Sequence, residues 1–160
     1  MISLVVARSS NGAIGRDGEL PWRLPSDMKR FRELTSGGVV VMGRRTYESL
    51  PDAFRPLPDR RNLVLSSDAG YEADGAEVFA DLDSALTAAG KECFVIGGER
   101  TYREALALAE RAYVTEVEEE VDGDTFFPAL AAGEWRCVER GEPLHENGYS
   151  FVFCVYERTS

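Results

Sequence analysis

The sequence predicts an α/β protein with a single domain, residues 1–160, built on a mostly parallel central sheet that helices flank. Short apolar runs alternate along the chain with segments of helical spacing, a pattern typical of parallel sheets covered by helices on both sides. The last part of the chain is extended instead, which predicts an antiparallel C-terminal hairpin. No repeat, long linker or low-complexity tract marks a domain boundary.

The apolar runs predict the parallel strands. Each run is bounded by polar residues or glycine, as in strands that are buried on both faces of a sheet. We expect these strands at residues 2–7, 39–42, 62–65 and 93–96. Helical spacing is clearest where Met28, Phe31 and Leu34 recur three residues apart. We expect helices at residues 25–34, 45–50, 82–89 and 99–109.

The C-terminal segments predict the hairpin. Residues 135–141 and 149–157 both read as extended chain. Between them stands the pair Asn147-Gly148, which favours a tight turn between antiparallel strands. Before the hairpin, residues 122–124 and Pro128 indicate a loop.

The composition argues against nucleic-acid and membrane binding. With 44% hydrophobic and 10% aromatic residues, the 160-residue chain can bury a substantial core. No stretch reaches the roughly 18 apolar residues of a spanning helix. No basic region precedes the first apolar run, so we expect a first strand rather than a signal peptide, and a cytoplasmic location. The net charge of −10 opposes binding to anionic partners.

The acidic excess has two explanations that the sequence leaves open. Lysine occurs only at Lys29 and Lys91, whereas arginine is common. Compositional bias of the encoding genome would produce this pattern. Adaptation to high salt would also produce it, because salt screens the repulsion of an acidic surface.

Cysteine and histidine offer little for metal or nucleophilic chemistry. Cys93, Cys137 and Cys154 are widely spaced, odd in number and next to strand-like residues, so we expect small core side chains. His145 is the only histidine. A two-histidine metal site and a serine–histidine triad are therefore not expected.

Glycine, arginine and serine follow three of the predicted strands. Gly97 and Gly98 follow the strand at 93–96, and Gly43 and Arg44 follow the strand at 39–42. Ser66 follows the strand at 62–65. Ordinary turns and solvated arginines would explain each feature alone. Their shared position favours a nucleotide site, because open α/β sheets bind ligands at the carboxyl ends of their strands.

Asp27 lies in the first turn of a predicted helix, among apolar neighbours such as Trp22, Met28 and Phe31. Aspartate is common at this position because it compensates the helix dipole and caps free amides. Alternatively, its partner arrives with a ligand, since a carboxylate in apolar surroundings is costly when unpaired. The residues alone allow both interpretations.

Seven motifs occur in order across essentially the whole chain, and together they resemble the dihydrofolate reductase family. The resemblance implies the family's α/β fold and its reaction, NADPH-dependent reduction of dihydrofolate. Hydride would pass to C6 and a proton would reach N5 through water. The motifs are Trp22, "LPSDMKRF", "VVVMGRRTYESL", "RRNLVLSS", "VIGGERTY", "VTEV" and "GDTFFP".

The resemblance also implies a substrate site. Asp27 would bind the 2-amino group and ring nitrogen of the pterin, with Thr115 assisting and Trp22 near a water that touches the pterin. Arg60 would pair with the α-carboxylate of the substrate glutamate. A longer connection at residues 51–55 leaves Arg61 as an alternative. The residues expected along the pterin and aminobenzoyl rings are Ala7, Met28, Phe31, Leu50 and Leu57.

The implied cofactor is NADPH, whose phosphates arginine suits as a forked donor. The resemblance implies that the peptide bond between Gly97 and Gly98 is cis. It also implies that the loop from Ile14 to Leu20 closes over the nicotinamide. The expected ligands are dihydrofolate and antifolate inhibitors. The expected oligomeric state is a monomer. The residues expected at the cofactor are Ala7, Ile14, Leu20, Gly43, Arg44, Arg45, Thr46, Ser66, Ser67, Ile96, Gly97, Gly98, Glu99, Arg100 and Tyr102.

Two other functions compete with this interpretation. The reductase domain of riboflavin synthesis shares the fold and NADPH, but it lacks the combination of Trp22, the helix that carries Asp27, and Arg60. A non-catalytic pterin- or nucleotide-binding module would bind without turnover. Dihydrofolate-dependent loss of NADPH absorbance separates the reductase from such a module.

Overall fold

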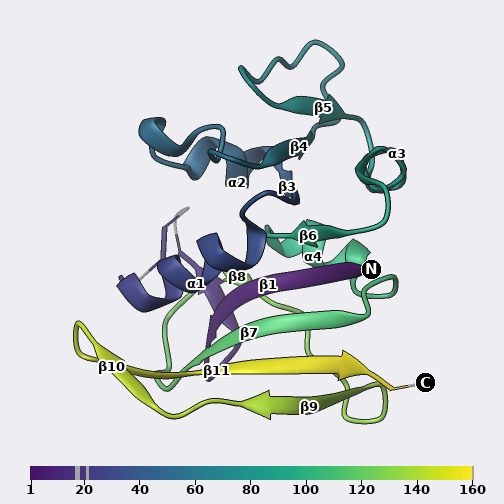
Figure 1. The fold of residues 1–160 in the computed structure, drawn as a ribbon. Helices are drawn as coiled ribbons and strands as arrows, with labels where there is room; N and C mark the ends of the chain where they lie inside the picture. The colour runs from purple at the N-terminus through teal and green to yellow at the C-terminus, as the bar shows by residue number, and fades with distance from the viewer. Residues whose placement is uncertain (17–18, 21, 160) are drawn as a thin grey trace.

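The computed structural model describes residues 1–16, 19–20 and 22–159. Within these residues a nine-stranded sheet has the order β10-β11-β7-β1-β6-β3-β4-β5, with β9 paired to β11, and β2 and β8 form a small second sheet (Figure 1). The strands are β1 (Ile2–Ser9), β2 (Ala13–Gly15), β3 (Val39–Gly43), β4 (Arg61–Leu65), β5 (Glu77–Phe79), β6 (Cys93–Val95), β7 (Arg111–Val117), β8 (Thr125–Phe126), β9 (Trp135–Arg140), β10 (Leu144–Glu146) and β11 (Tyr149–Arg158). The helices are α1 (Pro25–Thr35), α2 (Arg44–Ser49), α3 (Leu82–Ala89), α4 (Glu99–Ala105) and a short 3₁₀ helix (Asp52–Phe54).

The predicted fold class is confirmed. Six adjacent strands run parallel to one another, in the order β7, β1, β6, β3, β4 and β5. Strand β11 then pairs with β7 in the antiparallel direction. The C-terminal antiparallel pair is β9 with β11, as expected, and β10 adds a further strand. The expected tight turn joins β10 to β11, where Asn147 has φ 50° and Gly148 has φ 84°. Glycine and asparagine tolerate this left-handed backbone.

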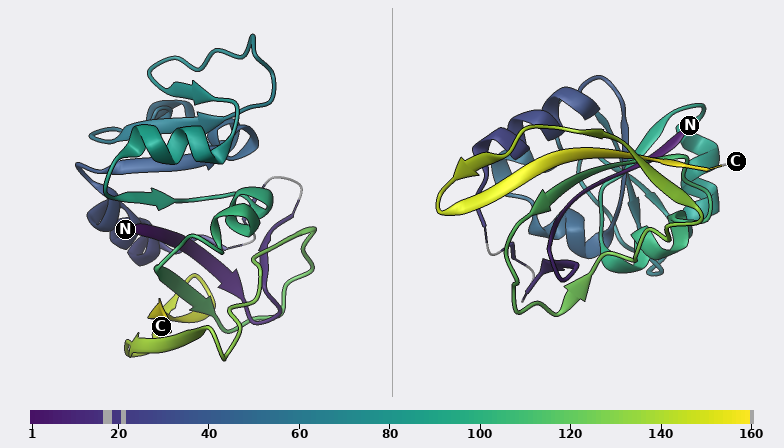
Figure 2. Two further views of the ribbon diagram at one scale, coloured as in Figure 1. Left: turned by 90° about the vertical axis from the view of Figure 1, so that its right-hand side faces the viewer. Right: turned by 90° about the horizontal axis from the view of Figure 1, so that it is seen from below.

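Helices cover both faces of the sheet (Figure 2). Successive residues of a strand point to opposite faces, and β3 shows the result. Val41 packs with Leu82 of α3 and Tyr102 of α4, whereas Met42 on the other face packs with Tyr47 of α2. Alternation along β3 therefore places its side chains in two different apolar clusters, and Phe31 of α1 packs against the second.

Helix α4 is shorter than the sequence predicts, because it ends at Ala105 rather than at residue 109. Residues 106–108 form a turn, although alanine and leucine favour a helix there. Arg158, from the end of β11, donates to the carbonyl oxygens of Leu106 and Ala109, the latter at 2.8 Å. A helix that ended at Ala109 would leave these carbonyls without internal partners, and this distant side chain donates to them instead.

One of the three cysteine predictions is wrong. Cys93 and Cys154 are buried, as expected, but Cys137 is exposed. Cys137 lies on β9, which has a partner strand on one side only in the described structure. Every residue of β9 after Trp135 is exposed, and the sequence around Cys137 does not show that its strand lies at the edge of the sheet.

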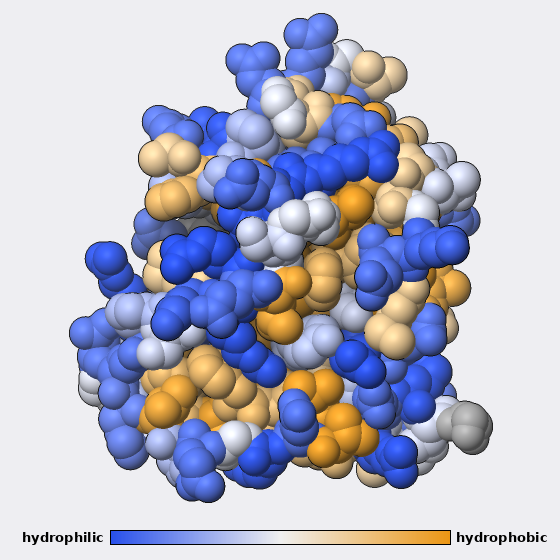
Figure 3. Space-filling view, viewed as in Figure 1, coloured by the Kyte–Doolittle hydropathy of each residue, from blue (hydrophilic) through white to orange (hydrophobic). Residues whose placement is uncertain are grey.

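The surface is largely polar. In Figure 3 hydrophilic residues cover most of the visible face, and hydrophobic residues show between them in separate patches. Among the described helices, none is long and apolar enough to cross a membrane.

Candidate active site

Helix α1 begins with a cap that comes from far along the chain. Leu24 occupies the N-cap position and has no side chain able to accept a hydrogen bond. Instead, Glu146 of β10 accepts hydrogen bonds from the backbone N–H of Ser26, at 3.0 Å, and from its hydroxyl. Free amides at a helix start require such an acceptor. Because Glu146 fills this role, Asp27 is not needed as the cap.

The carboxylate of Asp27 faces the sheet. The hydroxyl of Thr115, on β7, donates to Asp27 Oδ1 at 2.5 Å. Burial raises the pKa of Asp27 above its ordinary value, and Glu146 raises it further. The hydrogen bond from Thr115 and the charge of Arg30 lower this pKa but do not cancel the effect of burial. A carboxylate with one side-chain donor retains lone pairs for a ligand that can donate.

Trp22, five residues before Asp27, belongs to a small apolar cluster and is 6% exposed. It packs with Leu24, Val117 and Phe151, and Ala7 lies against the same cluster. Within the part of the chain that the structure describes, nothing accepts a hydrogen bond from its buried indole Nε1. A buried donor of this kind calls for a ligand or a water molecule.

Three of the five residues expected along the substrate rings share one apolar cluster. Phe31, Leu50 and Leu57 belong to a single apolar cluster with residues of β3 and β4. Met28, one turn before Phe31 on α1, is 56% exposed, so its side chain is available for contact. Ala7 is next to Thr115 across the β1–β7 pair. These five residues thus come from β1, from α1 and from the segments that follow α2.

Arg60 and Arg61 have different surroundings. The Arg60 guanidinium lies 5.7 Å from the centre of the Phe31 ring and donates to Thr35 at 3.0 Å. Burial lowers the pKa of Arg60. Arg61 instead forms a two-pronged ion pair with Glu77, at 2.5 and 2.8 Å. Arg60 is thus the arginine at the ring cluster, whereas Arg61 already has a carboxylate partner.

The glycine junction lies at the carboxyl edge of the sheet. The Gly97–Gly98 peptide bond is cis, as the resemblance implies, and Gly97 O accepts a hydrogen bond from Gly43 N at 2.9 Å. Gly97 has φ 141°, and a Cβ on Gly97 or Gly98 would lie 3.1 or 3.2 Å from the hydroxyl oxygen of Thr46. A side chain would therefore be strained here, and glycine keeps the backbone open to a ligand.

The three strand ends of the predicted nucleotide site are neighbours, because β6, β3 and β4 are adjacent in the sheet. Arg44 lies 4.1 Å from the Tyr71 ring centre and pairs with Glu48 at 3.1 Å and Asp68 at 3.6 Å. These carboxylates offset part of its charge. Ser66 is buried and accepts a hydrogen bond from Asp68 N. The expected cofactor residues Arg45, Ser67 and Arg100 are exposed.

The other expected cofactor residues have varied settings. Tyr102 is buried, and its hydroxyl donates to the carbonyl of Val5 at 2.6 Å. Glu99 accepts from Phe126 N at 2.5 Å. Ile14 is partly buried against the core and Ile96 against the ring cluster.

The loop before α1 is only partly described. Asp17 and Gly18, in the loop that the resemblance expects to close over the nicotinamide, lie outside the described residues, as does Pro21. Arg16 forms a bridge to Glu19 and donates to Asp122 at 2.6 Å. Leu20 is 54% exposed.

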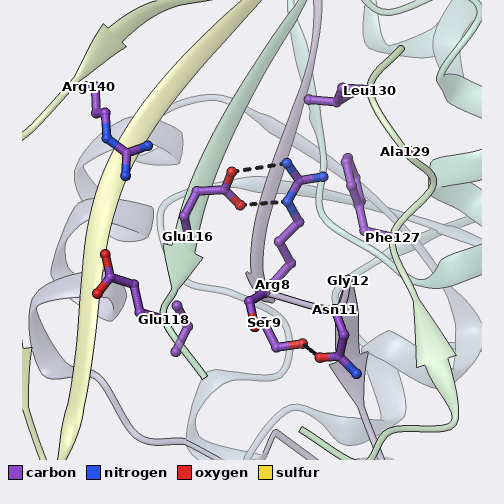
Figure 4. Close-up of a pocket in the computed structure, with 12 residues that line it drawn as sticks. Arg8, Ser9, Asn11, Gly12, Glu116, Glu118, Phe127, Ala129, Leu130 and Arg140 are labelled. Atoms are coloured by element: carbon purple, nitrogen blue, oxygen red, sulfur yellow. Dashed lines mark hydrogen bonds and ion pairs between the residues drawn. The ribbon is translucent and has the colours of Figure 1, made fainter. Parts of the chain in front are cut away.

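A second polar site lies on the opposite face of the sheet. Arg8 and Glu116, each one residue beyond Ala7 and Thr115, form a two-pronged ion pair at 2.6 and 3.0 Å. They line a hollow of about 520 Å³, in which Arg8 extends beside Phe127 (Figure 4). Tyr156 also donates to Glu116 at 2.7 Å. Arg8 and Glu116 therefore partner each other within this hollow.

The sequence interpretation missed two residues beside Asp27. Arg30 lies one helical turn beyond Asp27, a spacing that could have indicated it. Glu146 is far away in sequence, and no local pattern connects it to α1. Both contribute charge at Asp27.

The fold and these sites define an α/β enzyme of the nucleotide-binding class. The family model described as dihydrofolate reductase matches residues 1–158. The chain belongs to the dihydrofolate reductase family.

Individual relatives agree with this assignment. Dihydrofolate reductase of Mycobacterium leprae (strain TN) is 48% identical over 146 residues, which cover 84% of this chain and 88% of the relative. Dihydrofolate reductase of Bacillus subtilis (strain 168) is 39% identical over 162 residues, covering 99% and 95%. A solved structure of "Dihydrofolate reductase from Enterococcus faecalis", complexed with NADP(H) and RAB-propyl, has a TM-score of 0.90 at 32% identity, covering 100% of this chain and 97% of that chain.

Proposed function

We propose that this protein reduces 7,8-dihydrofolate to 5,6,7,8-tetrahydrofolate with NADPH, and that Asp27 is the carboxylate that binds the pterin. The activity and the cofactor are those of the family to which the chain belongs. The reaction supports one-carbon metabolism and the synthesis of thymidylate, purines and amino acids. The observation that carries the residue assignment is the buried Asp27 carboxylate, which one threonine hydroxyl contacts.

Asp27 and Thr115 would orient the pterin. A carboxylate can accept two hydrogen bonds side by side from the 2-amino group and the adjacent ring nitrogen, as it does from a guanidinium. Thr115 is held between Ala7 and Phe153 in the sheet register, so the donor to Asp27 has a fixed position. Such fixed placement supplies part of the rate enhancement, because the reacting atoms are aligned before reaction.

The rest of the substrate would follow the apolar cluster. Phe31, Leu50 and Leu57 offer apolar surface to the aminobenzoyl ring, with Met28 at the exposed rim. Arg60 lies beyond Phe31 and would bind the α-carboxylate of the glutamate. Arg61 is the weaker candidate, since Glu77 already occupies its guanidinium.

The residues at the carboxyl edge fit NADPH. Gly43, Gly97 and Gly98 leave open backbone where a Cβ would be crowded, which suits close approach of the nicotinamide and pyrophosphate. Arg44, Arg45, Thr46, Ser66, Ser67 and Arg100 would hold the pyrophosphate and the 2′-phosphate. When bound, NADPH supplies the hydride that reduces C6. Tyr102 supports this edge, because its backbone N–H donates to Gly98 O.

The proton would reach N5 through water. Asp27, as a negative charge near the pterin, would raise the fraction of substrate that is protonated at N5. The unpaired Nε1 of Trp22 would hold a water molecule beside the ring. Ile14 and Leu20 would close the site and exclude bulk water.

An absorbance assay and a thermal-shift comparison test this function. Dihydrofolate-dependent loss of NADPH absorbance is the expected result, and cofactor binding without turnover would favour a non-catalytic binding module. NADPH at about 100 times its dissociation constant should stabilise the fold by about 2.7 kcal/mol. NADH at the same concentration should stabilise it less, because it lacks the 2′-phosphate. Equal shifts would contradict the roles of Arg44, Ser67 and Arg100.

We further propose that the chain acts as a single domain, residues 1–160, and as a monomer in the cytoplasm without nucleic-acid or membrane partners. The net charge of −10 supports the last point. Light scattering during size-exclusion chromatography should give the mass of one chain, and a dimer mass would overturn the proposal.

A further inference from the structure

Arg30 lies on the same side of α1 as Asp27, one turn further along the helix. Residues three apart on a helix are neighbours on its surface. The Arg30 guanidinium is 4.5 Å from the centre of the Phe153 ring and 5.8 Å from that of Tyr113. An arginine at these distances is held by the negative face of an aromatic ring. The guanidinium therefore faces the sheet rather than extending into solvent.

The two aromatic rings that contact Arg30 belong to residues next to Thr115, the residue that donates a hydrogen bond to Asp27. Phe153 is opposite Thr115 in the β11–β7 register, and Tyr113 is two residues before Thr115 on the same face of β7. Arg30 is thus held by one side chain across the strand pair from Thr115 and by another on the same strand as Thr115. This arrangement sets the position of its charge relative to Asp27.

The charged and titratable groups around Asp27 act in opposite directions. Arg30 on α1 favours the ionised carboxylate, and so does the hydroxyl of Thr115 on β7. Glu146 on β10 opposes ionisation, as does burial, which raises the pKa of Asp27 most strongly. Tyr102 on α4 also senses the charge of Asp27, but its own raised pKa keeps it neutral.

Arg30 has further neighbours of its own. Burial lowers its pKa, while Asp27, Cys154, Glu139 and Tyr113 raise it. An arginine remains charged under such influences, since its ordinary pKa is far above neutral pH. It is therefore a permanent cation near a carboxylate whose pKa burial raises.

We propose that Arg30 is a positioning residue for the reaction. Its guanidinium, held against the Phe153 ring, keeps Asp27 ionised so that the carboxylate can accept hydrogen bonds from the pterin. The proposal deepens the function proposed above and rests on it for the role of Asp27. Arg30 acts through Asp27 and need not touch the substrate.

Arg30→Met tests this directly, because methionine retains much of the apolar stem and removes the charge. The readout is the carboxyl ¹³C shift of Asp27, followed against pH by NMR in the ligand-free protein. Removing an opposite charge within about 4–6 Å moves a carboxyl titration by about 1–3 units. We expect the Asp27 midpoint to rise by about one pH unit.

Three companion variants make the test specific. Arg30→Lys keeps a cation and should restore more than half of the shift. Lys29→Met removes a cation from the exposed face of the same helix, where Lys29 pairs with Glu33 at 3.8 Å, and should leave the midpoint unchanged. Arg30→Gln serves if the methionine variant does not fold, since it also removes the charge but keeps a polar end.

The outcomes separate this proposal from the proposed function. A midpoint that stays at the parental pH in both Arg30→Met and Arg30→Gln would overturn it, and so would an equal shift in Lys29→Met. The pH dependence of the hydride-transfer rate should move upward with the carboxyl midpoint. A midpoint that moves while the rate profile stays fixed would support the coupling of Arg30 to Asp27 and overturn the catalytic role of Asp27 itself.

Discussion

Asp27 and Glu116 are carboxylates on opposite faces of one sheet, and the protein partners them differently. Glu116 receives two hydrogen bonds from Arg8 and one from Tyr156. Burial alone would raise the pKa of Glu116, but these donors lower it overall. Asp27 receives a hydrogen bond from Thr115, and burial leaves its pKa raised.

The difference shows how the two sites divide stability from function. A carboxylate whose donors all come from the fold strengthens that fold and has little left to offer a ligand. One that the fold leaves short of donors costs stability and retains capacity to bind. Under the proposed function, the neighbouring β7 residues Thr115 and Glu116 would serve these two purposes, because they point to opposite faces of the sheet.

The largest predicted effect is on catalysis at Asp27. Asp27→Asn keeps the size of the side chain and removes its charge, so the hydride-transfer rate at neutral pH should fall by about 10²–10⁴-fold. Glu116→Gln makes the same chemical change on the other face and should keep the rate within about threefold of the parent. Stopped-flow measurement of NADPH oxidation gives both rates. An Asp27→Asn enzyme as fast as the parent would show that both faces are structural.

The second-largest predicted effect is a loss of folding stability, and it comes from changing Glu116 on the other face of the sheet. Glu116→Gln leaves the guanidinium of Arg8 without its anion, and a lost hydrogen bond to a charged group costs about 1.5–3 kcal/mol. We expect a loss at the low end of this range, because both side chains are partly exposed. Urea unfolding measures it. The control is Glu77→Gln, which breaks the more exposed Arg61 pair and should cost about 0–1 kcal/mol.

A smaller effect concerns the donor to Asp27. Thr115→Val keeps a branched side chain suited to β7 and removes the hydroxyl, which is worth about 1 kcal/mol and thus roughly a fivefold change in affinity. Dihydrofolate affinity should weaken by this factor. Thr87→Val removes a hydroxyl from α3, where it donates to Asp83 O, and should not change the affinity. An unchanged affinity in Thr115→Val would remove Thr115 from the site.

The smallest predicted effect is the pH dependence of folding stability, which should have opposite signs for the two carboxylates. The raised pKa of Asp27 makes the parent lose stability as pH rises from about the ordinary value of 3.8 through the folded pKa, so Asp27→Asn should gain relative to the parent over that range. The lowered pKa of Glu116 makes the parent lose stability as pH falls below about 4.5. The deficit of Glu116→Gln should therefore shrink below that pH. Unfolding curves from pH 3 to 8 would refute the contrast if both differences had the same slope.

The sequence predicted the parts of this comparison that local patterns encode. Apolar runs predicted the parallel strands, and the glycines and arginines after them predicted a binding site at one edge of the sheet, where the three strand ends are neighbours. The resemblance located Asp27 and paired it with Thr115. These features depend on periodicity, turn chemistry and motifs, which are properties of neighbouring residues.

The remainder depends on contacts between distant segments. Glu146 caps α1 from 120 residues away, and Arg158, at the end of β11, donates to the carbonyls that follow α4. The Arg8–Glu116 pair requires β1 and β7 to be adjacent, which no local pattern shows. Cys137 is exposed because its strand is at an edge. Such effects follow from topology and overrule local preference.

The most direct test of the account follows both carboxyl groups through one titration. The ¹³C shifts of Asp27 and Glu116 would be recorded against pH, first in the free protein and then with a 2,4-diaminopyrimidine antifolate, whose ring presents paired donors. We predict that Asp27 titrates above its ordinary value in the free protein and falls to lower pH on binding, because the ligand supplies the missing donors. Glu116 should titrate low in both states. An Asp27 midpoint that the ligand does not move, or a Glu116 midpoint that moves as far, would contradict the account.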